Sequence, residues 1–337
     1  MRYYRMIAFQ PDTGDIMREW TSHPNGKFDP HALDLEVDVF SGPYAEPTGA
    51  SSITLHGPAL QDLGQAYSWG LTSDQQTGAT KPGWGLAFYG GMGPGLPMAN
   101  PKQAGLILAG QIVQSWGNWE GTEMTLEFKV SASVYTLADP GPFVLNWPAG
   151  RELGDALKEC LQLAYPGMTV SMNIGTGYLQ LHDDTAIFST LDQLARWVAQ
   201  LTAGRFRKRV DIGIQGLTIY VIDPSYQPPP VRIDYTDMIG QPTWIGPGLM
   251  QVKCVMRADI AWGSRIEMPK GMQDNPGIVL AAASALPSSI RYKSAFSGPF
   301  KVTALRHVGR YRSADGASWV TIINAMPLAP ITGKASS

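Results

Sequence analysis

The sequence predicts a mainly β protein that carries a small α+β insert. Three observations support this fold class: dense glycine and proline, long stretches of alternating apolar and polar residues, and two helical stripes near the middle of the chain. The 337 residues include 37 Gly and 26 Pro, which indicates many turns and therefore many short strands. A chain of this length is long enough for two or three domains.

Residues 1–140 are predicted to form a first β-domain. The segment HALDLEVDVF (31–40) alternates apolar residues at odd positions with acidic residues at 34, 36 and 38, and MTLEFKV (124–130) alternates in the same way. Two further strands are expected in ASSITLHG and in AGLILAGQIVQSW, and the second is apolar enough to be buried on both faces. The Gly/Pro-rich segment 83–101 is expected to be a loop.

Residues 141–204 are predicted to form the α+β insert, with short strands between two helices. RELGDALKECLQLAYPG places apolar residues at the 3–4 spacing of one helix face, and Pro166 and Gly167 should end that helix. STLDQLARWVAQLTAG repeats the spacing. Thr190 and Gln193 match a capping box at its start, and Gly204 is expected to cap its end.

Residues 205–330 are predicted to form a second β-domain, followed by a flexible tail over 331–337. Strands are expected in VDIGIQGLTIYVI, VRIDYT, LMQVKCVMRADI, SRIEMP, FKVTALRHVG and ASWVTIINAM. YQPPPV (226–231) should be a stiff, extended link. The order of β-domain, insert and β-domain hints at a duplicated β-module, although the sequence contains no clean repeat.

The amino-acid composition narrows the range of possible functions. Charged residues make up only 16% of the chain, against the usual quarter, which favours a surface hidden against partners over the alternative of a large, well-buried chain. The net charge of −2 argues against a tight nucleic-acid reader. Residues 1–62 hold nine acids and four bases, and residues 291–337 hold seven bases and one acid. This polarity would suit head-to-tail or side-by-side association, or simply two solvated faces.

Targeting and redox signals point to a cytoplasmic site of synthesis. Cys160 and Cys254 form no Cys-x-x-Cys pair and fall on apolar faces, so both are expected to be reduced core residues. The N-terminal residues lack the apolar run of a signal peptide, and no apolar run is long enough to span a membrane.

Three motifs resemble catalytic or ligand-binding sites, and each has a simpler structural interpretation. Asp12-Thr13-Gly14 suggests an aspartic protease, but that chemistry needs two carboxylates and no second Asp-Thr-Gly or Asp-Ser-Gly exists, which favours a hairpin turn. The glycine run 90–95 lacks the Gly-Lys-Ser/Thr of a P-loop, which favours a mobile or partner-contacting loop. His182-Asp183-Asp184 has no other His nearby in sequence, which favours a turn over a metal site. No catalytic residue, cofactor or metal ligand is therefore predicted.

The only dense basic run is Arg205, Arg207, Lys208 and Arg209. It follows a predicted helix C-terminus, where cations complement the helix dipole. Contact with phosphates is the alternative, although four charges make a modest counterion-release contribution.

A set of short motifs, taken in order, resembles the baseplate hub proteins of contractile-tailed bacteriophages. The motifs are DMIGQPT (237–243), the alternating QVKCVM (251–256), Asp259-Ile260, Gly263-Ser264-Arg265-Ile266, Val302, His307-Val308-Gly309 and Ser318-Trp319-Val320-Thr321. The resemblance covers about residues 50–325 and is strongest over 231–325. The family often has Asp where this chain has Arg310, a departure that would alter a subunit contact. Arg310 therefore joins the four basic residues as a candidate interface or channel position.

The resemblance implies two tail-tube-like β-domains, of barrel or sandwich form, and a structural function without catalysis. A homotrimer would form a ring of quasi-sixfold shape that joins the tail tube to the central spike and continues the DNA channel. Its partners would be the tube protein, the spike protein and other baseplate proteins, with DNA passing only transiently. The protein would be located in the baseplate of the virion tail, after assembly in the cytoplasm of the host bacterium.

Two alternatives stay open at this point. One is a β-rich, tail-associated hydrolase acting on peptide or cell-wall glycan, which would need a convergent pair of carboxylates in a cleft. The other is a different tail component built from the same β-module, against which stand the chain length and the helical insert.

Overall fold

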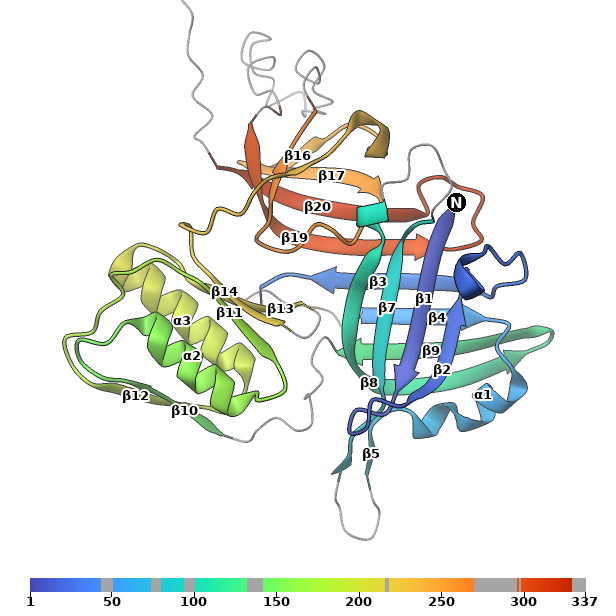
Figure 1. Cartoon of the computed structure of the whole chain (residues 1–337), viewed down its shortest axis with the longest axis horizontal. Coiled ribbons are helices and arrows are strands. Elements are labelled where there is room, and N and C mark those ends of the chain that lie inside the picture. Colours follow the sequence, from blue (N-terminus) through green and yellow to red (C-terminus); the bar gives the residue numbers. More distant parts are fainter. Residues whose placement is uncertain are drawn as a thin grey trace, which may run out of the picture.

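The computed structural model describes residues 1–43, 51–73, 80–93, 101–131, 142–215, 218–269, 296 and 298–328. These residues form two β-domains and a small α+β insert, which lies to one side of them in Figure 1. The predicted fold class, mainly β with an α+β insert, is confirmed.

The first β-domain consists of two sheet layers around an aromatic core. Its strands are β1 (Arg2–Phe9), β2 (Ile16–Thr21), β3 (Asp34–Ser41), β4 (Ser51–His56), β5 (Thr72–Ser73), β6 (Thr80–Lys81), β7 (Gly85–Met92), β8 (Gly105–Glu120) and β9 (Glu123–Ser131), with helix α1 (Leu60–Gln65) and 3₁₀ turns at Pro24–Gly26, Ala66–Ser68 and Pro101–Gln103. The 16-residue strand β8 belongs to both layers, because its first half pairs with β7 and its second half with β9. Strands β1, β2 and β7 therefore cross β3, β4 and β9 steeply in Figure 1. Trp69 lies fully buried between the layers and stacks on Trp84 and Phe128.

The prediction of a loop over 83–101 is wrong for its first part. Residues 85–92 form β7, which pairs with β1 on one side and β8 on the other. The glycines here serve close packing: a Cβ on Gly90 would lie 2.8 Å from Cδ1 of Ile107, and one on Gly91 would lie 2.7 Å from the Ala104 Cα. The remainder of the glycine run, from residue 94, lies outside the described residues.

The second β-domain contains β15 (Val231–Arg232), β16 (Thr243–Gly246), β17 (Leu249–Val255), β18 (Arg265–Glu267), β19 (Pro299–Arg310) and β20 (Trp319–Pro327), with a 3₁₀ turn at Tyr235–Asp237. The apolar face predicted for 250–256 is buried, with Met250, Val252 and Cys254 in the core of this domain. Met256 reaches instead into the core of the first β-domain. Both cysteines are free and buried, as predicted.

The two β-domains are joined by direct strand pairing, which the sequence did not indicate. β19 pairs antiparallel with β3 from Leu305 opposite Ser41 to Arg310 opposite Glu36. The main strand order is β16-β17-β20-β19-β3-β4-β9-β8-β7-β1-β2. One continuous sheet therefore runs through both domains.

The insert contains β10 (Phe143–Trp147), α2 (Leu153–Ala164), β11 (Thr169–Asn173), β12 (Asp184–Phe188), α3 (Leu191–Phe206), β13 (Asp211–Gln215) and β14 (Thr218–Ile222). Its two helices lie between the hairpin-like pair β10–β12 and the three-stranded sheet β11-β14-β13 (Figure 1). All six apolar positions of the stripe predicted on α2 are buried: Leu153, Ala156, Leu157, Cys160, Leu161 and Ala164. That stripe is therefore confirmed.

The insert extends further along the chain than the boundary expected at residue 204. β13 and β14, placed by sequence in the second β-domain, pair with each other and with β11. Ile212, Ile214, Ile219 and Val221 belong to the same core cluster as the two helices. The alternation of these strands looks the same whichever core they join, so only the pairing identifies their domain.

The end of α3 also differs from prediction. The helix continues past Gly204 to Phe206, and Arg207 takes the left-handed conformation with φ 53°. Its start agrees with the hydroxyl half of the predicted capping box, because the Gln193 N–H donates to Thr190 Oγ1 at 3.2 Å. Gln193 Oε1 accepts at 3.0 Å from the N–H of Ser189, one residue before the N-cap, and not from the N–H of Thr190 itself.

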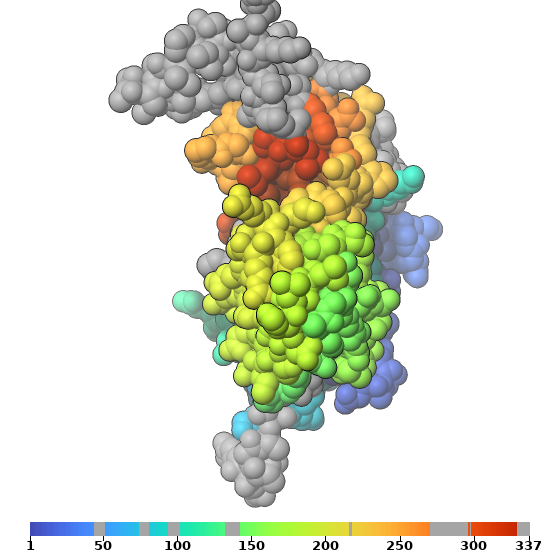
Figure 2. Space-filling model, turned by 90° about the vertical axis from the view of Figure 1, so that its left-hand side faces the viewer, coloured from blue at the N-terminus to red at the C-terminus, as the bar shows by residue number. Residues whose placement is uncertain are grey.

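The insert is held against the β-domains by close backbone approach. A Cβ on Gly213 would lie 3.0 Å from Cζ3 of Trp262 and 3.1 Å from the carbonyl oxygen of Gly42, so only glycine fits there without a shift. Lys301 in β19 also donates to the carbonyl of Asp223 at 3.4 Å. Figure 2 shows the insert standing out in front of the β-domains, with its outer surface exposed.

Candidate functional site

The sheet that joins the two β-domains has one polar face, opposite the core. Side chains alternate along each strand, so the residues between the buried positions of β3, β4, β9, β17, β19 and β20 all lie on this face. We call this surface the polar face. Its polar side chains are Asp34, Glu36, Asp38, Ser52, Thr54, His56, Glu127, Lys129, Gln251, Lys253, Arg306, Arg310 and Asn324, and the half-buried Phe40, Val308 and Ile322 lie among them. It is hollowed on both sides of the β3–β19 junction, once around Arg306 and once around Arg310.

The charges at the junction neutralise one another across strands. Arg306 of β19 binds Asp38 of β3 through Nε at 2.8 Å and Nη2 at 2.5 Å. Arg310 binds Asp34 at 2.9 Å and Glu36 at 3.1 Å. Each cation of the second β-domain thus meets carboxylates of the first. Exposed pairs of this kind contribute little to stability, so their main effect is on the electrostatic character of the surface.

The pKa values of these groups follow from the pairing. The hydrogen bond from Arg306 lowers the pKa of Asp38, and the Asp38 carboxylate raises the pKa of Arg306. Burial works against ionisation of Asp34, but the Arg312 backbone N–H and the Arg310 guanidinium keep its pKa below its ordinary value. Both carboxylates therefore remain ionised well into the acid range, and the charge balance of the junction persists around neutral pH.

The five candidate residues from the sequence do not form one site. Arg310 lies on the polar face, whereas Arg205, Arg207, Lys208 and Arg209 lie on the insert at the end of α3. Arg205 donates to Gln180, and Arg209 binds Asp211 at 2.6 Å. Arg207 and Lys208 are exposed and form no ion pair with a described residue.

The motifs that resembled catalytic or metal sites occupy turns. A backbone hydrogen bond of 2.8 Å from Gly14 to Gln10 closes the β1–β2 turn, in which Asp12 is exposed. Asp183 accepts from the Ala149 backbone N–H at 2.8 Å and so links its turn to the segment between β10 and α2, whereas Asp184 accepts from Gln180 at 2.9 Å, four residues before it. Within the described ranges, no group of three or more His, Cys, Asp and Glu side chains could hold a metal ion. No helix in that part of the chain is long and apolar enough to cross a membrane.

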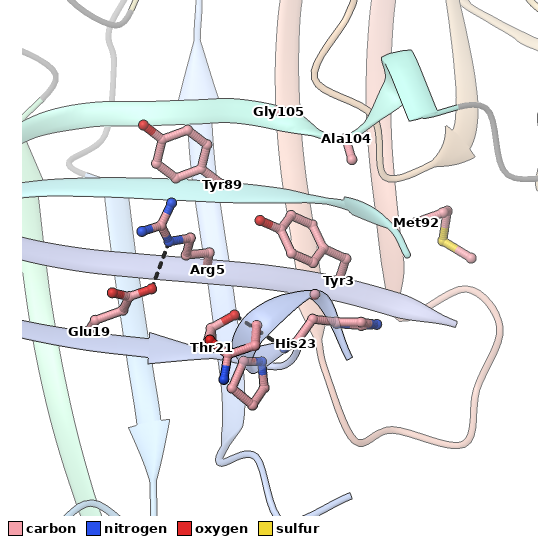
Figure 3. A pocket seen from close by; sticks show the side chains of 12 residues that line it. Tyr3, Arg5, Glu19, Thr21, His23, Tyr89, Met92, Ala104 and Gly105 are labelled. Atoms are coloured by element: carbon pink, nitrogen blue, oxygen red, sulfur yellow. Dashed lines mark hydrogen bonds and ion pairs between the residues drawn. The ribbon is translucent and has the colours of Figure 1, made fainter. Parts of the chain in front are cut away.

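The outward face of β1, β2 and β7 carries a hollow of about 690 Å³ (Figure 3). Tyr3, Tyr89 and Arg5 form its floor, and His23 lies at its rim with its ring centroid 5.5 Å from that of Tyr3. Its lining contains one carboxylate, Glu19, which binds Arg5 at 2.7 Å. The lining thus lacks the paired carboxylates that glycoside or aspartic-protease chemistry requires.

Sequence reasoning missed Arg306 and the acidic residues that bind it and Arg310. The alternation of 31–40 placed Asp34, Glu36 and Asp38 on one strand face, and that signal was available. The pairing partner of the strand, about 270 residues away, carried no local signal.

Comparison with solved structures identifies the fold. The chain superposes on the tail protein from Neisseria meningitidis MC58 with a TM-score of 0.50 and 10% identity, over 96% of each chain. The 43 kDa tail protein of prophage MuSo2 from Shewanella oneidensis gives a TM-score of 0.48 at 8% identity, over 97% of this chain and 98% of that one. The E. coli c3393 protein, a type VI secretion component described as similar to the T4 tail proteins gp27 and gp5, gives 0.48 at 10% identity, over 89% and 74%.

The sequence itself matches no protein-family model and no curated protein. At 10% identity the likeness to the Neisseria tail protein concerns the fold alone. The chain therefore has a tail-protein fold, mostly of antiparallel sheet.

Proposed function

We propose that this chain is a structural protein of a phage-type tail, the hub of its baseplate. Three copies form a ring that joins the tail tube to the central spike, and the polar face lines the channel through which DNA passes. The ring assembles in the cytoplasm of the host bacterium and acts in the virion without a cofactor. The observation that carries this proposal is the continuous eight-stranded antiparallel path from β16 to β8, with one face packed into the cores and the other rich in charged and polar side chains.

The number of strands supports a ring. Three copies of eight strands give 24 strands, and at a spacing of about 4.8 Å such a ring measures roughly 37 Å across its backbone before tilt widens it. A channel of that width leaves room for a nucleic-acid duplex and the side chains around it.

Electrostatics support a conduit rather than a binding site. A protein that binds DNA tightly presents Lys and Arg side chains that are free to contact the phosphates. Here Arg306 and Arg310 are already bound to Asp38, Asp34 and Glu36. A passing phosphate would have to displace these carboxylates, so the surface should hold DNA weakly.

The native mass of the purified chain tests the ring. Light scattering on a sizing column, across a concentration series, should give about three times 36.5 kDa. A species that stays monomeric at every concentration would contradict self-assembly of the ring.

A second experiment tests the conduit. The double variant Glu36→Gln/Asp38→Asn frees Arg306 and leaves Arg310 with Asp34 alone, so it should bind duplex DNA with a steep salt dependence, whereas the wild type should not. Asp12→Asn/Asp15→Asn removes the same charge from an exposed turn and serves as the matched control. If both double variants bind DNA equally, net charge and not the polar face would explain the effect.

A further inference from the structure

We infer that neighbouring copies join through two free sheet edges: residues 116–120 of β8 in one copy pair antiparallel with β16 of the next. This inference rests on the proposed ring and names the partner of each edge. The occupant of both edges is a second copy of this chain.

The first edge is the outer half of β8. The pairing of β7 with β8 ends at Gln111, and Leu71 covers the next position with a 3.0 Å backbone hydrogen bond to Val113. From Trp116 to Glu120 the strand still pairs with β9, but no described strand pairs with its other side. All five of these residues are exposed, and the side chain of Trp119 is 63% exposed.

The second edge is β16, at the opposite end of the eight-stranded path. It pairs only with β17 among the described strands, and its burial alternates between exposed and half-buried positions. Ile245 is 48% exposed there. An ordered edge with unpaired N–H and C=O groups is a template for another strand, and ring closure is one way to remove it.

Strand direction favours joining these two edges. Each neighbouring pair in the path from β16 to β8 is antiparallel, and the path contains eight strands. Because eight is even, the first and last strands run in opposite directions. Placing β16 of a new copy beside β8 therefore continues the antiparallel alternation. The β3–β19 junction already shows this kind of contact between a first and a second β-domain within one chain.

The offset between the two edges agrees with a tilted barrel. Followed from strand to strand, the pairing registers place Val255 of β17 level with Gln114 of β8. Met250 lies five residues before Val255 in β17 and pairs with Trp244 of β16. Trp244 is therefore level with a position in β8 about five residues before Gln114. The free half of β8 centres on Asn118, about nine residues beyond that level. An offset of about nine residues across eight strands is about one residue per strand. A closed barrel whose strands tilt by about 36° has the same stagger.

Disulfide trapping tests the contact. Asn118→Cys and Ile245→Cys are combined in one chain, and neighbouring positions 116, 120 and 243 allow for a shift of register. Within one copy the two edges lie roughly 30 Å apart across the sheet, far beyond the 7 Å that a disulfide can bridge. Any disulfide between them must therefore link two copies. The native cysteines are buried and should not compete.

After mild oxidation the double variant should give covalent dimers and trimers on a non-reducing gel, with no band above the trimer. Each single-cysteine variant should remain monomeric on the same gel. Ile16→Cys with Asn118→Cys is the matched control, because Ile16 is an exposed isoleucine on β2, which pairs only with β1 among the described strands. Cross-linking of that control instead, or of Asn118→Cys alone, would overturn the proposed pairing.

A lysine variant gives a second readout. Ile245→Lys should shift the native mass from trimer to monomer while the far-UV circular dichroism stays that of the wild type, whereas Ile16→Lys should remain trimeric. A wild type that is trimeric by light scattering but gives no cross-link at any of the paired positions would refute the edge assignment and leave the hub proposal standing. A chain that is monomeric and never cross-links would refute both.

Discussion

The buried imidazole of His307 should make folding stability depend on pH between 7 and 5. His307 lies in β19 with 2% of its surface exposed, and its Nδ1 is 3.0 Å from Thr321 Oγ1. Burial lowers its pKa to about 4. The unfolded chain accepts a proton near pH 6.5, which the folded chain resists, so this contribution is intact above pH 6.5 and is lost as the pH falls toward 4. The full loss is roughly 3 kcal/mol, of which roughly 2 kcal/mol develops between pH 7 and pH 5.

Urea unfolding followed by tryptophan fluorescence at pH 7 and pH 5 measures this effect. The wild type should lose roughly 2 kcal/mol more than His307→Gln between the two pH values, because glutamine cannot titrate. The comparison uses each protein's own change with pH, so a variant that is less stable at both pH values still gives an answer. His31→Gln, at an exposed position, should behave as the wild type. Equal losses for the wild type and His307→Gln would refute the argument.

Three further predictions concern packing, capping and thiol reactivity. A Cβ on Gly309 would lie 2.4 Å from Cε3 of the buried Trp319, so Gly309→Ala should destabilise the fold by about 1–3 kcal/mol in thermal denaturation; Gly316→Ala, with no atom within 4 Å, should not. Thr190→Ala removes the cap of α3 and should cost about 1 kcal/mol by the same measurement, and an unchanged melting temperature would contradict the capping role. Burial raises the pKa of the two native cysteines to about 11 and about 12, so Ellman's reagent at pH 8 should react rapidly only after unfolding.

Local patterns predicted the individual elements well. The apolar stripe of 153–164 and the alternation of 34–41 depend on 3.6-residue and two-residue periods, and each period states which side of the element is buried. The capping box at Thr190 is likewise a short-range signal. Fold class follows from such elements taken together, which is why it could be inferred from one sequence.

The pairing of strands that are distant in sequence could not be predicted in this way. β13 and β14 have the alternation of any strand, and only their pairing with β11 assigns them to the insert. From sequence alone, the glycines of β7 indicate a loop. Their reason is visible only in the structure, where atoms of Ile107 and Ala104 approach them too closely for a side chain to fit. The polar face was missed for the same reason, because Arg310 finds Asp34 only after β19 has paired with β3.

The pairing of β3 with β19 also determines when the chain can finish folding. β3 ends at Ser41, and β19 begins at Pro299, so the ribosome must add about 260 residues before the partner strand exists. At a synthesis rate of about 5–20 residues per second, the edge of β3 would stay unpaired for some 10–50 seconds. Throughout that interval the first β-domain presents an alternating strand with an open edge, the kind of surface that invites wrong pairing. The acidic residues of β3 later bind arginines. Until then, their negative charges would repel the same strand in other copies and so keep the unpaired edge soluble.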